Sequence, residues 1–245
     1  MRLIELETVD STNNYAKEHA AGLDSPVMIV AREQTAGRGQ RGNSWESEPG
    51  ANLTFSAFVR LPQIPARRQF ALSEGVALAV ADTLAAFGIE VKVKWPNDIY
   101  VGDRKICGIL IEHAIMGAGL THSIIGAGIN VNQRRFLSPA PNPVSMWQLL
   151  GRETPVEAVR EEMMRRLEDC FGRMDDEEGR MAVHAEFLRR LWRGDGKAYP
   201  FRDAATGEVF YARIEGIDPD GPLLLRLPAD ATLRTYLFKQ VEFLL

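Results

Sequence analysis

Between residues 91 and 130 the chain alternates apolar runs with tight turns, and this pattern constrains the fold more than any other feature. The apolar runs are residues 91–95, 99–101, 105–114 and 121–130. Gly102 and Asp103 form a hairpin signal after the second run, and residues 116–119 form another turn before the fourth. Successive hairpins predict a mixed, mainly antiparallel sheet with helices packed against it, which is an α+β fold.

Periodicity predicts the other elements of the first 192 residues. Residues 53–60 alternate apolar side chains such as Leu53 and Phe55 with others such as Thr54, which predicts a strand with one buried face. Residues 66–87 are rich in Ala and Leu and predict a long, largely buried helix. Further strands are expected at residues 2–8 and 27–31, and further helices at about 11–21, 155–174 and 176–192.

The chain changes character at residues 193–196, Arg-Gly-Asp-Gly. Beyond them, short strands are expected at about residues 208–217, 222–227, 233–238 and 241–245. A tail built of such short strands predicts a small SH3-like β-barrel. We therefore divide the chain into a larger domain, residues 1–192, and a C-terminal barrel, residues 193–245.

The composition excludes several classes of protein. A formal net charge of -4 disfavours general nucleic-acid binding, which usually needs a basic excess. No apolar run approaches the roughly 20 residues that span a bilayer, and Glu5 interrupts the segment where a signal peptide needs apolar residues. The two cysteines and four histidines show no metal-ligand spacing. We expect a cytoplasmic protein without a membrane segment or its own metal site.

The most informative segment for function is residues 34–45, Gln-Thr-Ala-Gly-Arg-Gly-Gln-Arg-Gly-Asn-Ser-Trp. Its glycines let the backbone approach a ligand closely. Arg38 and Arg41 supply planar cationic donors suited to phosphate or carboxylate, and Trp45 could stack on a ring. The Gly-Lys-Ser/Thr ending of a P-loop is absent. Two alternatives stay open on these residues alone, a flexible surface loop and an Arg-Gly segment that binds nucleic acid.

Two polar groups interrupt the apolar runs. Lys94, Asn97 and Asp98 cluster beside a proline-fixed turn, where the alternative to a site is a surface ion pair. Lys105 stands at the start of a strand, where a hairpin would present it, although a lone lysine usually faces solvent. Gly108 lies inside that strand, and such a glycine often marks a bulge or a close approach by a ligand.

Residues 126–132, Gly-Ala-Gly-Ile-Asn-Val-Asn, look like the start of a dinucleotide-binding fingerprint. Val131 occupies the third glycine position and the flanking pattern is not a βαβ unit, so we reject the Rossmann interpretation. Asn130 and Asn132 remain candidate polar contacts at a strand end. The chain also lacks a Gly-x-Ser-x-Gly elbow and the kinase signature set, which weighs against an esterase and a kinase.

Taken in order, these segments closely resemble the biotin–protein ligases. The matching segments are residues 11–15 (Ser-Thr-Asn-Asn-Tyr), 34–45, 94–98, 105–108, 126–130 and 221–225. Each motif is weak alone, but the ordered set is specific and covers nearly the whole chain. The resemblance implies a fold related to class II synthetases, in which a mixed sheet flanked by helices is followed by a small SH3-like barrel.

The resemblance also implies an activity. The protein would activate biotin with ATP as biotinyl-5′-AMP and transfer it to a lysine of the biotin carboxyl carrier protein of acetyl-CoA carboxylase. Mg²⁺ would be carried mostly by the ATP phosphates, and exposed strand edges could support a homodimer. Only ten residues precede Ser11, too few for the N-terminal helix-turn-helix of the family's repressors. We therefore expect a ligase that does not bind DNA.

The resemblance assigns roles residue by residue. The expected biotin contacts are Ser11, Thr12, Asn13, Gln34, Arg38, Gly39, Gln40, Lys105 and Gly108. The expected nucleotide contacts are Arg41, Trp45, Lys94, Asn97 and Asn130. As catalytic residues we expect Lys105 and Arg38, which would offset the repulsion between two anions, and Asp98, which could deprotonate the acceptor lysine. Gln40 stands where some members carry another arginine, so retention of the adenylate could differ.

Two rival functions stay open. A lipoate or octanoate ligase shares the superfold, but the chain lacks that family's Arg-Arg-x-x-Gly-Gly-Gly stretch. A non-catalytic module that binds biotin or nucleic acid is the rival from another class. Arg38, Trp45 and Lys105 favour catalysis over passive binding.

Overall fold

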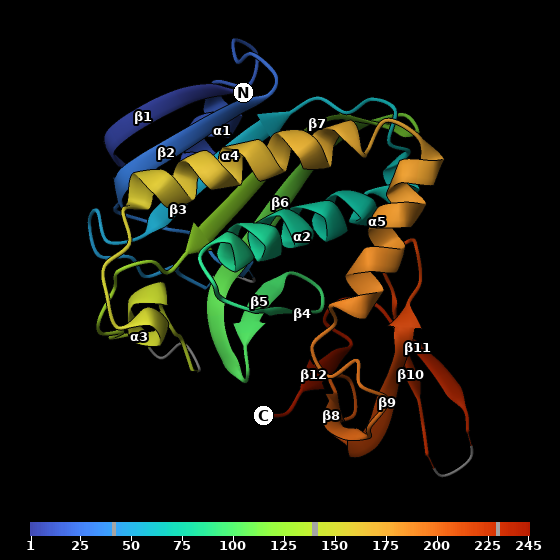
Figure 1. The fold of residues 1–245 in the computed structure, drawn as a ribbon. Helices are drawn as coiled ribbons and strands as arrows, with labels where there is room; N and C mark the ends of the chain where they lie inside the picture. The colour runs from blue at the N-terminus through green and yellow to red at the C-terminus, as the bar shows by residue number, and fades with distance from the viewer. Residues whose placement is uncertain (41–42, 139–141, 229–230) are drawn as a thin grey trace.

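The computed structural model describes residues 1–40, 43–138, 142–228 and 231–245, which form two β-sheets (Figure 1). The larger sheet has seven strands in the order β1-β2-β3-β7-β6-β5-β4. They are β1 (Arg2–Val9), β2 (Val27–Gln34), β3 (Leu53–Val59), β4 (Lys92–Lys94), β5 (Asp98–Val101), β6 (Arg104–Met116) and β7 (Gly119–Ile129). Only the β1–β2 pair is parallel among these neighbours, which confirms the expected mixed, mainly antiparallel sheet.

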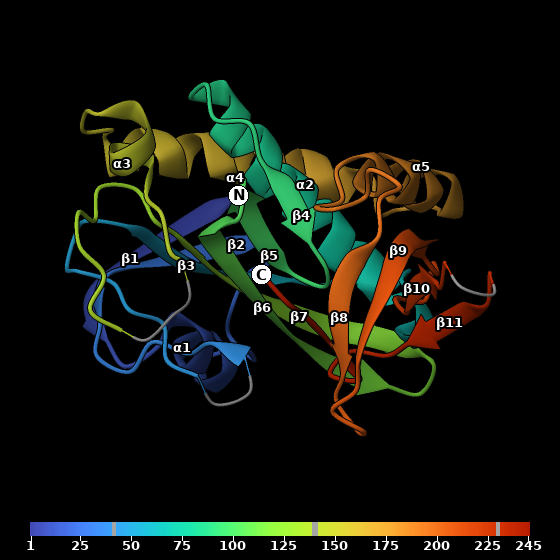
Figure 2. The same ribbon diagram turned by 90° about the horizontal axis from the view of Figure 1, so that it is seen from below.

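Helices lie on both faces of this sheet (Figure 2). They are α1 (Thr12–Glu18), η2 (Ala66–Arg68), α2 (Phe70–Ala86), α3 (Met146–Leu150), α4 (Val156–Gly172) and α5 (Glu177–Arg189). Helix α2 packs against α4 and α5 on one face, and α1 contacts β2, β3 and β7 on the opposite face. The four predicted helices are present with shorter bounds, and the short α3 is an addition to them.

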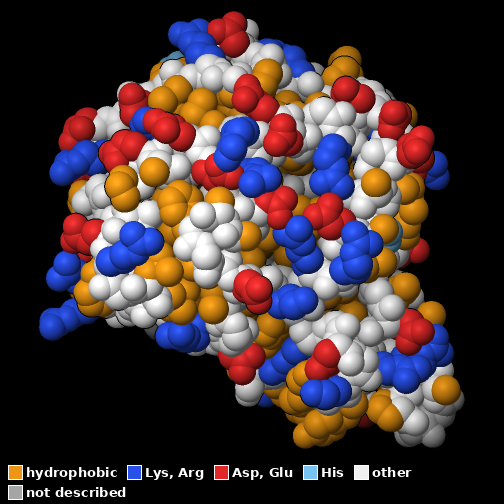
Figure 3. All heavy atoms as spheres, viewed as in Figure 1, with side chains coloured by type: hydrophobic (Ala, Val, Ile, Leu, Met, Phe, Trp, Pro, Cys, Tyr) orange, Lys and Arg blue, Asp and Glu red, His pale blue; other side chains and the backbone are white. Residues whose placement is uncertain are grey.

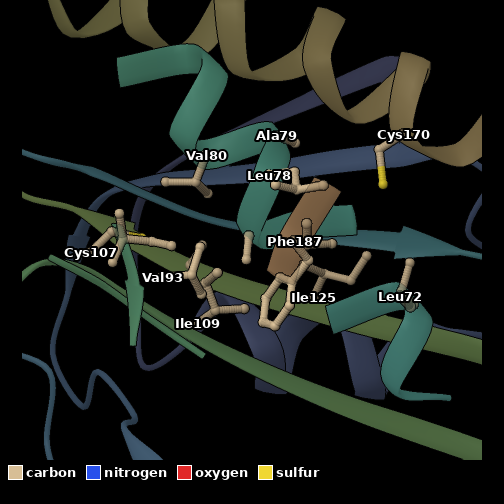
Figure 4. Close-up of a cluster of buried hydrophobic side chains, with 14 of the residues drawn as sticks. Leu72, Leu78, Ala79, Val80, Val93, Cys107, Ile109, Ile125, Cys170 and Phe187 are labelled. Atoms are coloured by element: carbon tan, nitrogen blue, oxygen red, sulfur yellow. The ribbon is translucent and has the colours of Figure 1, made fainter. Parts of the chain in front are cut away.

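The main core lies between the sheet and α2, where Val80 of the helix lies above Val93 of β4 (Figure 4). Helix α2 is buried on nearly every side because α4 and α5 cover the side that faces away from the sheet. Gly75 permits this close packing, since a Cβ there would lie 2.6 Å from Cys170 Sγ. The predicted burial of this helix is confirmed.

Strand β3 corrects one prediction. The alternating pattern indicated a single buried face, but every residue of Leu53–Val59 is buried. The second face is covered because α1 packs on it, and Phe58 joins a smaller apolar cluster with Ala16 of that helix. Polar Ser56, on the α1 side, is therefore fully buried.

The second sheet has five strands in the order β11-β10-β9-β8-β12. They are β8 (Tyr199–Asp203), β9 (Val209–Ile217), β10 (Leu223–Arg226), β11 (Leu233–Tyr236) and β12 (Val241–Phe243). The expected C-terminal unit of short strands is present, but within the described residues its antiparallel sheet is not closed into a barrel and has β11 and β12 as its edges. These edge strands have four and three residues, and each pairs along its length with one neighbour.

Hydrogen bonds and apolar contacts join the two sheets, with Trp95 just after β4 and Trp192 in the segment between α5 and β8. Trp95 Nε1 donates a hydrogen bond to Gly221 O at 2.9 Å, and Trp192 Nε1 donates to Gly102 O at 2.8 Å. One apolar cluster continues from α2 and the larger sheet into Phe201 of the smaller sheet. This junction brings the chain's C-terminal strand to the side of the larger sheet where β4 and β5 lie (Figure 2).

The face covered by α2, α4 and α5 carries basic and acidic side chains intermingled (Figure 3). Several of them are paired, as where Arg190 reaches both Asp82 and Glu186 at 2.5 and 2.8 Å. Such a mixed surface does not offer the basic stripe expected of a nucleic-acid binder. Among the described helices, none is both long enough and apolar enough to cross a membrane.

Candidate active site

A cavity of about 610 Å³ opens where the larger sheet meets residues 34–46 and the C-terminal strand β12. Of the fifteen site residues predicted from sequence, Arg41 lies outside the described residues, and the other fourteen all line this cavity. The fourteen are Ser11, Thr12, Asn13, Gln34, Arg38, Gly39, Gln40, Trp45, Lys94, Asn97, Asp98, Lys105, Gly108 and Asn130. The fold thus gathers five separate sequence segments around one site.

The start of α1 supplies a buried polar corner of the cavity. Gln34 Oε1 accepts hydrogen bonds from Thr12 N at 2.8 Å and from Thr12 Oγ1 at 3.1 Å. Ser56 Oγ donates to Asn13 Oδ1 at 2.5 Å and lies 2.8 Å from Thr12 Oγ1. Since buried hydrogen-bonded side chains have few alternative rotamers, this corner is preorganised to present polar groups to a ligand.

Arg38 is linked to the same polar corner by the carboxylate of Glu112, which accepts hydrogen bonds from both Arg38 and Asn13. Its guanidinium donates to Glu112 Oε1 and Oε2 at 3.3 Å each and to Asn14 Oδ1 at 3.0 Å. Glu112 Oε2 also accepts from Asn13 Nδ2 at 2.9 Å. The Arg38 side chain is 41% exposed, so it borders the cavity and can meet an incoming anion.

Glycines on the sheet make room for two of these side chains. Gly126 and Gly128 are two residues apart on β7 and so face the same side. A Cβ at Gly126 would lie 2.3 Å from Asn13 Oδ1, and one at Gly128 would lie 2.3 Å from Trp45 Cε2. Gly108 pairs with Gly128 across β6 and β7, and a Cβ at Gly108 would lie 3.0 Å from the same indole. The glycines that resembled a dinucleotide fingerprint are therefore strand residues whose missing side chains leave room for Asn13 and Trp45.

Lys105 and Asp98 form an ion pair within the cavity, with Nζ and Oδ1 2.7 Å apart. Both are about one quarter exposed, at 29% and 25%, so a ligand could reach either group. They meet because β5 and β6 pair antiparallel, with a register shift between Ile99 and Tyr100. Asn97 lies beside them, and its Nδ2 donates to Ile109 O.

Lys94 is enclosed by aromatic rings. Its Nζ lies 4.8, 5.6 and 5.5 Å from the ring centroids of Tyr100, Trp192 and Phe243, and it donates to Tyr100 Oη at 3.1 Å. Cation–π contacts partly replace the water that such an ammonium loses. Burial holds the pKa of Lys94 below its ordinary value despite nearby Asp98.

Two buried polar atoms of the cavity lining have no hydrogen-bond partner within the described part of the chain. They are Trp45 Nε1, a donor, and Asn130 Oδ1, an acceptor. Asn130 is otherwise held in place, since its Nδ2 donates to Val144 O at 3.1 Å. Unsatisfied buried groups are rare in folded proteins, so these two atoms are candidates for ligand contacts.

Several residues important to the site were not among those predicted. Ser56 and Glu112 hold the polar corner, while Phe136, Glu242 and Phe243 line the cavity. A faint signal existed for Ser56 and Glu112, because each interrupts an apolar strand. Phe136 and the C-terminal pair stand in segments without a recognisable motif.

Solved structures share this fold. The biotin protein ligase from Aquifex aeolicus, in complex with biotin and ATP, matches with a TM-score of 0.79 and covers 98% of this chain and 97% of that one. The two sequences are 23% identical, so this likeness shows the fold alone. The seven-stranded sheet with helices on both faces is therefore the fold of that ligase.

Sequence comparison identifies the family. Residues 5–130 match the model of the biotin/lipoate A/B protein ligase family. A biotin–[acetyl-CoA-carboxylase] ligase of Paracoccus denitrificans is 33% identical over 245 residues, which cover 91% of this chain and 94% of that protein. The chain therefore belongs to the biotin/lipoate A/B protein ligase family, and the expected kinship with biotin–protein ligases is confirmed.

A second relative matches over a shorter length. The bifunctional ligase/repressor BirA of Escherichia coli (strain K12) is 44% identical over 125 residues. That match covers 47% of this chain and 39% of the E. coli protein.

Proposed function

We propose that this protein is an ATP-dependent biotin–protein ligase that forms biotinyl-5′-AMP and transfers biotin to a lysine of the carboxyl carrier domain of acetyl-CoA carboxylase. The observation that carries the proposal is the convergence of thirteen expected biotin and nucleotide contacts, together with Asp98, on one cavity. The name of the Paracoccus relative and the ligands of the Aquifex structure support it.

In the first half-reaction, the carboxylate of biotin attacks the α-phosphate of ATP and pyrophosphate leaves. Thr12, Asn13 and Gln34 offer the polar corner in which a ureido ring would be held. Arg38 and Lys105 then offset the repulsion between the two anions. Because both cations already pair with carboxylates in the cavity, substrate binding exchanges one anionic partner for another.

In the second half-reaction, the carrier lysine attacks the acyl carbon and AMP leaves. The amine must first lose a proton, since its free pKa is about 10.4. Asp98 is our candidate for the base, and it lies 2.7 Å from Lys105 in the cavity wall. The incoming amine would take the place of the Lys105 ammonium beside this carboxylate.

Among the described residues, no three His, Cys, Asp or Glu side chains gather as a metal cluster. We propose that Mg²⁺ accompanies ATP on its phosphates. The homodimer and the cytoplasmic location remain predictions.

The deciding experiment is biotin-dependent ATP–pyrophosphate exchange, followed by mass spectrometry of a carrier domain. Exchange and a biotin-sized mass gain are expected. Exchange with lipoate in place of biotin would move the protein to the sister branch of the family. A protein that exchanges with neither acid would be a binding module, and the catalytic roles of Arg38, Asp98 and Lys105 would be lost.

A further inference from the structure

Glu46, which follows Trp45, directs its carboxylate at the segment after β7. Oε1 accepts hydrogen bonds from Leu137 N at 2.8 Å and from Gln133 Nε2 at 3.0 Å. Oε2 accepts from Ser138 N at 2.6 Å. Hydrogen bonds to an ionised acceptor are shorter and stronger than neutral ones, so this contact joins two segments that are about 90 residues apart in the chain.

The contact is anchored to the sheet through buried amides. Gln133 is fully buried, and its Oε1 accepts from Asn52 Nδ2 at 2.5 Å and from Glu48 N at 3.2 Å. Asn52 Oδ1 in turn accepts from Val131 N at 2.9 Å. Asn52 and Val131 adjoin the neighbouring strands β3 and β7. Glu46 is therefore fixed relative to β3 and β7 through the buried side chains of Gln133 and Asn52.

Both joined segments line the cavity. Trp45 and Glu46 come from one, and Phe136 and Ser138 from the other. Burial alone would raise the pKa of Glu46, but hydrogen bonds from Leu137, Ser138 and Gln133 outweigh it and hold the pKa below its ordinary value. The carboxylate is thus charged at neutral pH, when its hydrogen bonds are strongest.

We propose that Glu46 is a positioning residue that holds Trp45 and the 133–138 segment together and so sets the lifetime of the enzyme-bound acyl-adenylate. This inference rests on the proposed function. A mixed anhydride is lost when it dissociates or when water reaches it, and a wall kept together by charged hydrogen bonds slows both. Both carboxylate oxygens of Glu46 are occupied by N–H donors of the 133–138 segment, so we assign it to holding the cavity wall and not to the chemical step.

The test compares Glu46→Gln with Glu48→Gln. The first variant replaces a carboxylate oxygen that accepts from N–H groups with an amide NH₂, at almost unchanged size. The second removes the same charge from an exposed side chain two residues away. The half-life of bound biotinyl-adenylate is measured after gel filtration, with biotin-dependent exchange and the melting temperature measured in parallel.

For Glu46→Gln we expect an adenylate half-life about tenfold shorter, which corresponds to the loss of roughly one charged hydrogen bond. Biotin-dependent exchange should fall by a much smaller factor than the half-life. Glu48→Gln should keep the original half-life. A merely structural role would lower exchange and melting temperature together, and that result would overturn the proposal.

Equal half-lives in all three proteins, or equal shortening in both variants, would also overturn it. If circular dichroism shows that Glu46→Gln does not fold, Glu46→Asp keeps the charge but shortens its reach, and an unchanged half-life there would be decisive against the proposal. Absence of exchange in the unsubstituted protein would instead remove the proposed function, and this inference with it.

Discussion

Gly126 and Gly128 determine how closely Asn13 and Trp45 lie on the sheet. At either position a Cβ would come within 2.3 Å of the neighbouring side chain, closer than any van der Waals contact allows. The polar corner and the indole wall therefore depend on atoms that these residues lack. Their conformational freedom is irrelevant here, since both occupy regular strand positions on β7.

Gly128→Ala should displace the Trp45 indole and weaken nucleotide binding by at least about tenfold, because a shift of about 1 Å in a binding site has effects of this size or larger. Calorimetric titration with ATP measures it. Gly119→Ala, also on β7, is the matched control, since its Cβ would come no closer than 3.5 Å to Pro62 O. Equal affinities in both variants would refute the steric role of Gly128.

Arg38→Ala should increase leakage of the adenylate about tenfold, because the site loses a planar cation worth roughly one charged hydrogen bond. Release of labelled adenylate from the enzyme is the measurement. Arg32→Ala serves as control, since Arg32 of β2 forms an exposed pair with Glu7 of the neighbouring edge strand β1. Unchanged retention in Arg38→Ala would count against the assigned role.

Glu74 gives a pH dependence that is independent of the site. Its carboxylate is 1% exposed and lies 2.7 Å from His184 Nδ1, and Arg68 also faces it. Burial raises the pKa of Glu74 above the ordinary 4.5, although the contacts with His184 and Arg68 oppose the shift. The unfolded chain then binds fewer protons in that window, so the contribution of Glu74 is complete below pH 4.5 and is lost as pH rises through the folded-state pKa.

Relative to Glu74→Gln, the unsubstituted protein should therefore lose free energy of unfolding as pH rises above 4.5. Urea unfolding of both proteins across a pH series checks the sign. Glu161→Gln, which changes an exposed side chain of α4, should show no such trend. An increasing difference with pH would show that pairing with His184 and Arg68 outweighs burial.

Helix α2 owes its place in the core to its small residues. Its Ala and Gly positions let α4 and α5 pack on one side while Leu and Val meet the sheet on the other (Figure 4). A helix of this composition is apolar all round, and such a helix is stable only when covered on every side.

Gly75→Ala should lower the free energy of unfolding by about 1–3 kcal/mol, because overpacking against Cys170 outweighs the roughly 1 kcal/mol gain in helix propensity. Adding Cys170→Ala should recover part of the loss. Gly172→Ala, with nothing within 4 Å of the new Cβ, should lack this overpacking cost. Urea denaturation measures all of them, and a stabilised Gly75→Ala would show that α2 and α4 can move apart freely.

On the scale of the whole molecule, the two sheets share one core. The apolar cluster runs from Leu72 of α2 to Phe201 and Leu225 of the smaller sheet. The same sheet sends β12 to the cavity, where Phe243 helps to enclose Lys94. We therefore propose that residues 1–192 and 193–245 are structural units that do not fold independently.

The protein should accordingly unfold in one cooperative transition, with tryptophan fluorescence and far-ultraviolet circular dichroism giving coincident curves. Trp95 donates a hydrogen bond across the junction between the sheets, to Gly221, and Trp192 donates one beside the junction, to Gly102. The fluorescence of both tryptophans therefore reports on this junction. Two separated transitions would show that the smaller sheet unfolds on its own. A single transition in a fragment of residues 1–192, at the original midpoint, would lead to the same conclusion.

The sequence by itself determined the sheet class, most helices and the segments that line the cavity. Alternation and turn residues act between neighbours in the chain, so the hairpins of β5, β6 and β7 are predictable from their own residues. The ordered motifs then named fourteen of the residues that converge on one cavity. Their convergence was implied by a family resemblance, and spacing alone would not have shown it.

Only the tertiary structure decided the rest. Arg38 and Glu112 are 74 residues apart, and their contact depends on how residues 34–46 pack across β6. The burial of Ser56 depends on α1 covering β3, which alternation within β3 cannot reveal. The number of short strands does not determine whether a sheet closes into a barrel. Closure requires the two edge strands to pair, and β11 and β12 are not neighbours in the smaller sheet. Local patterns record what lies next along the chain, whereas these features depend on which distant segments come to lie together.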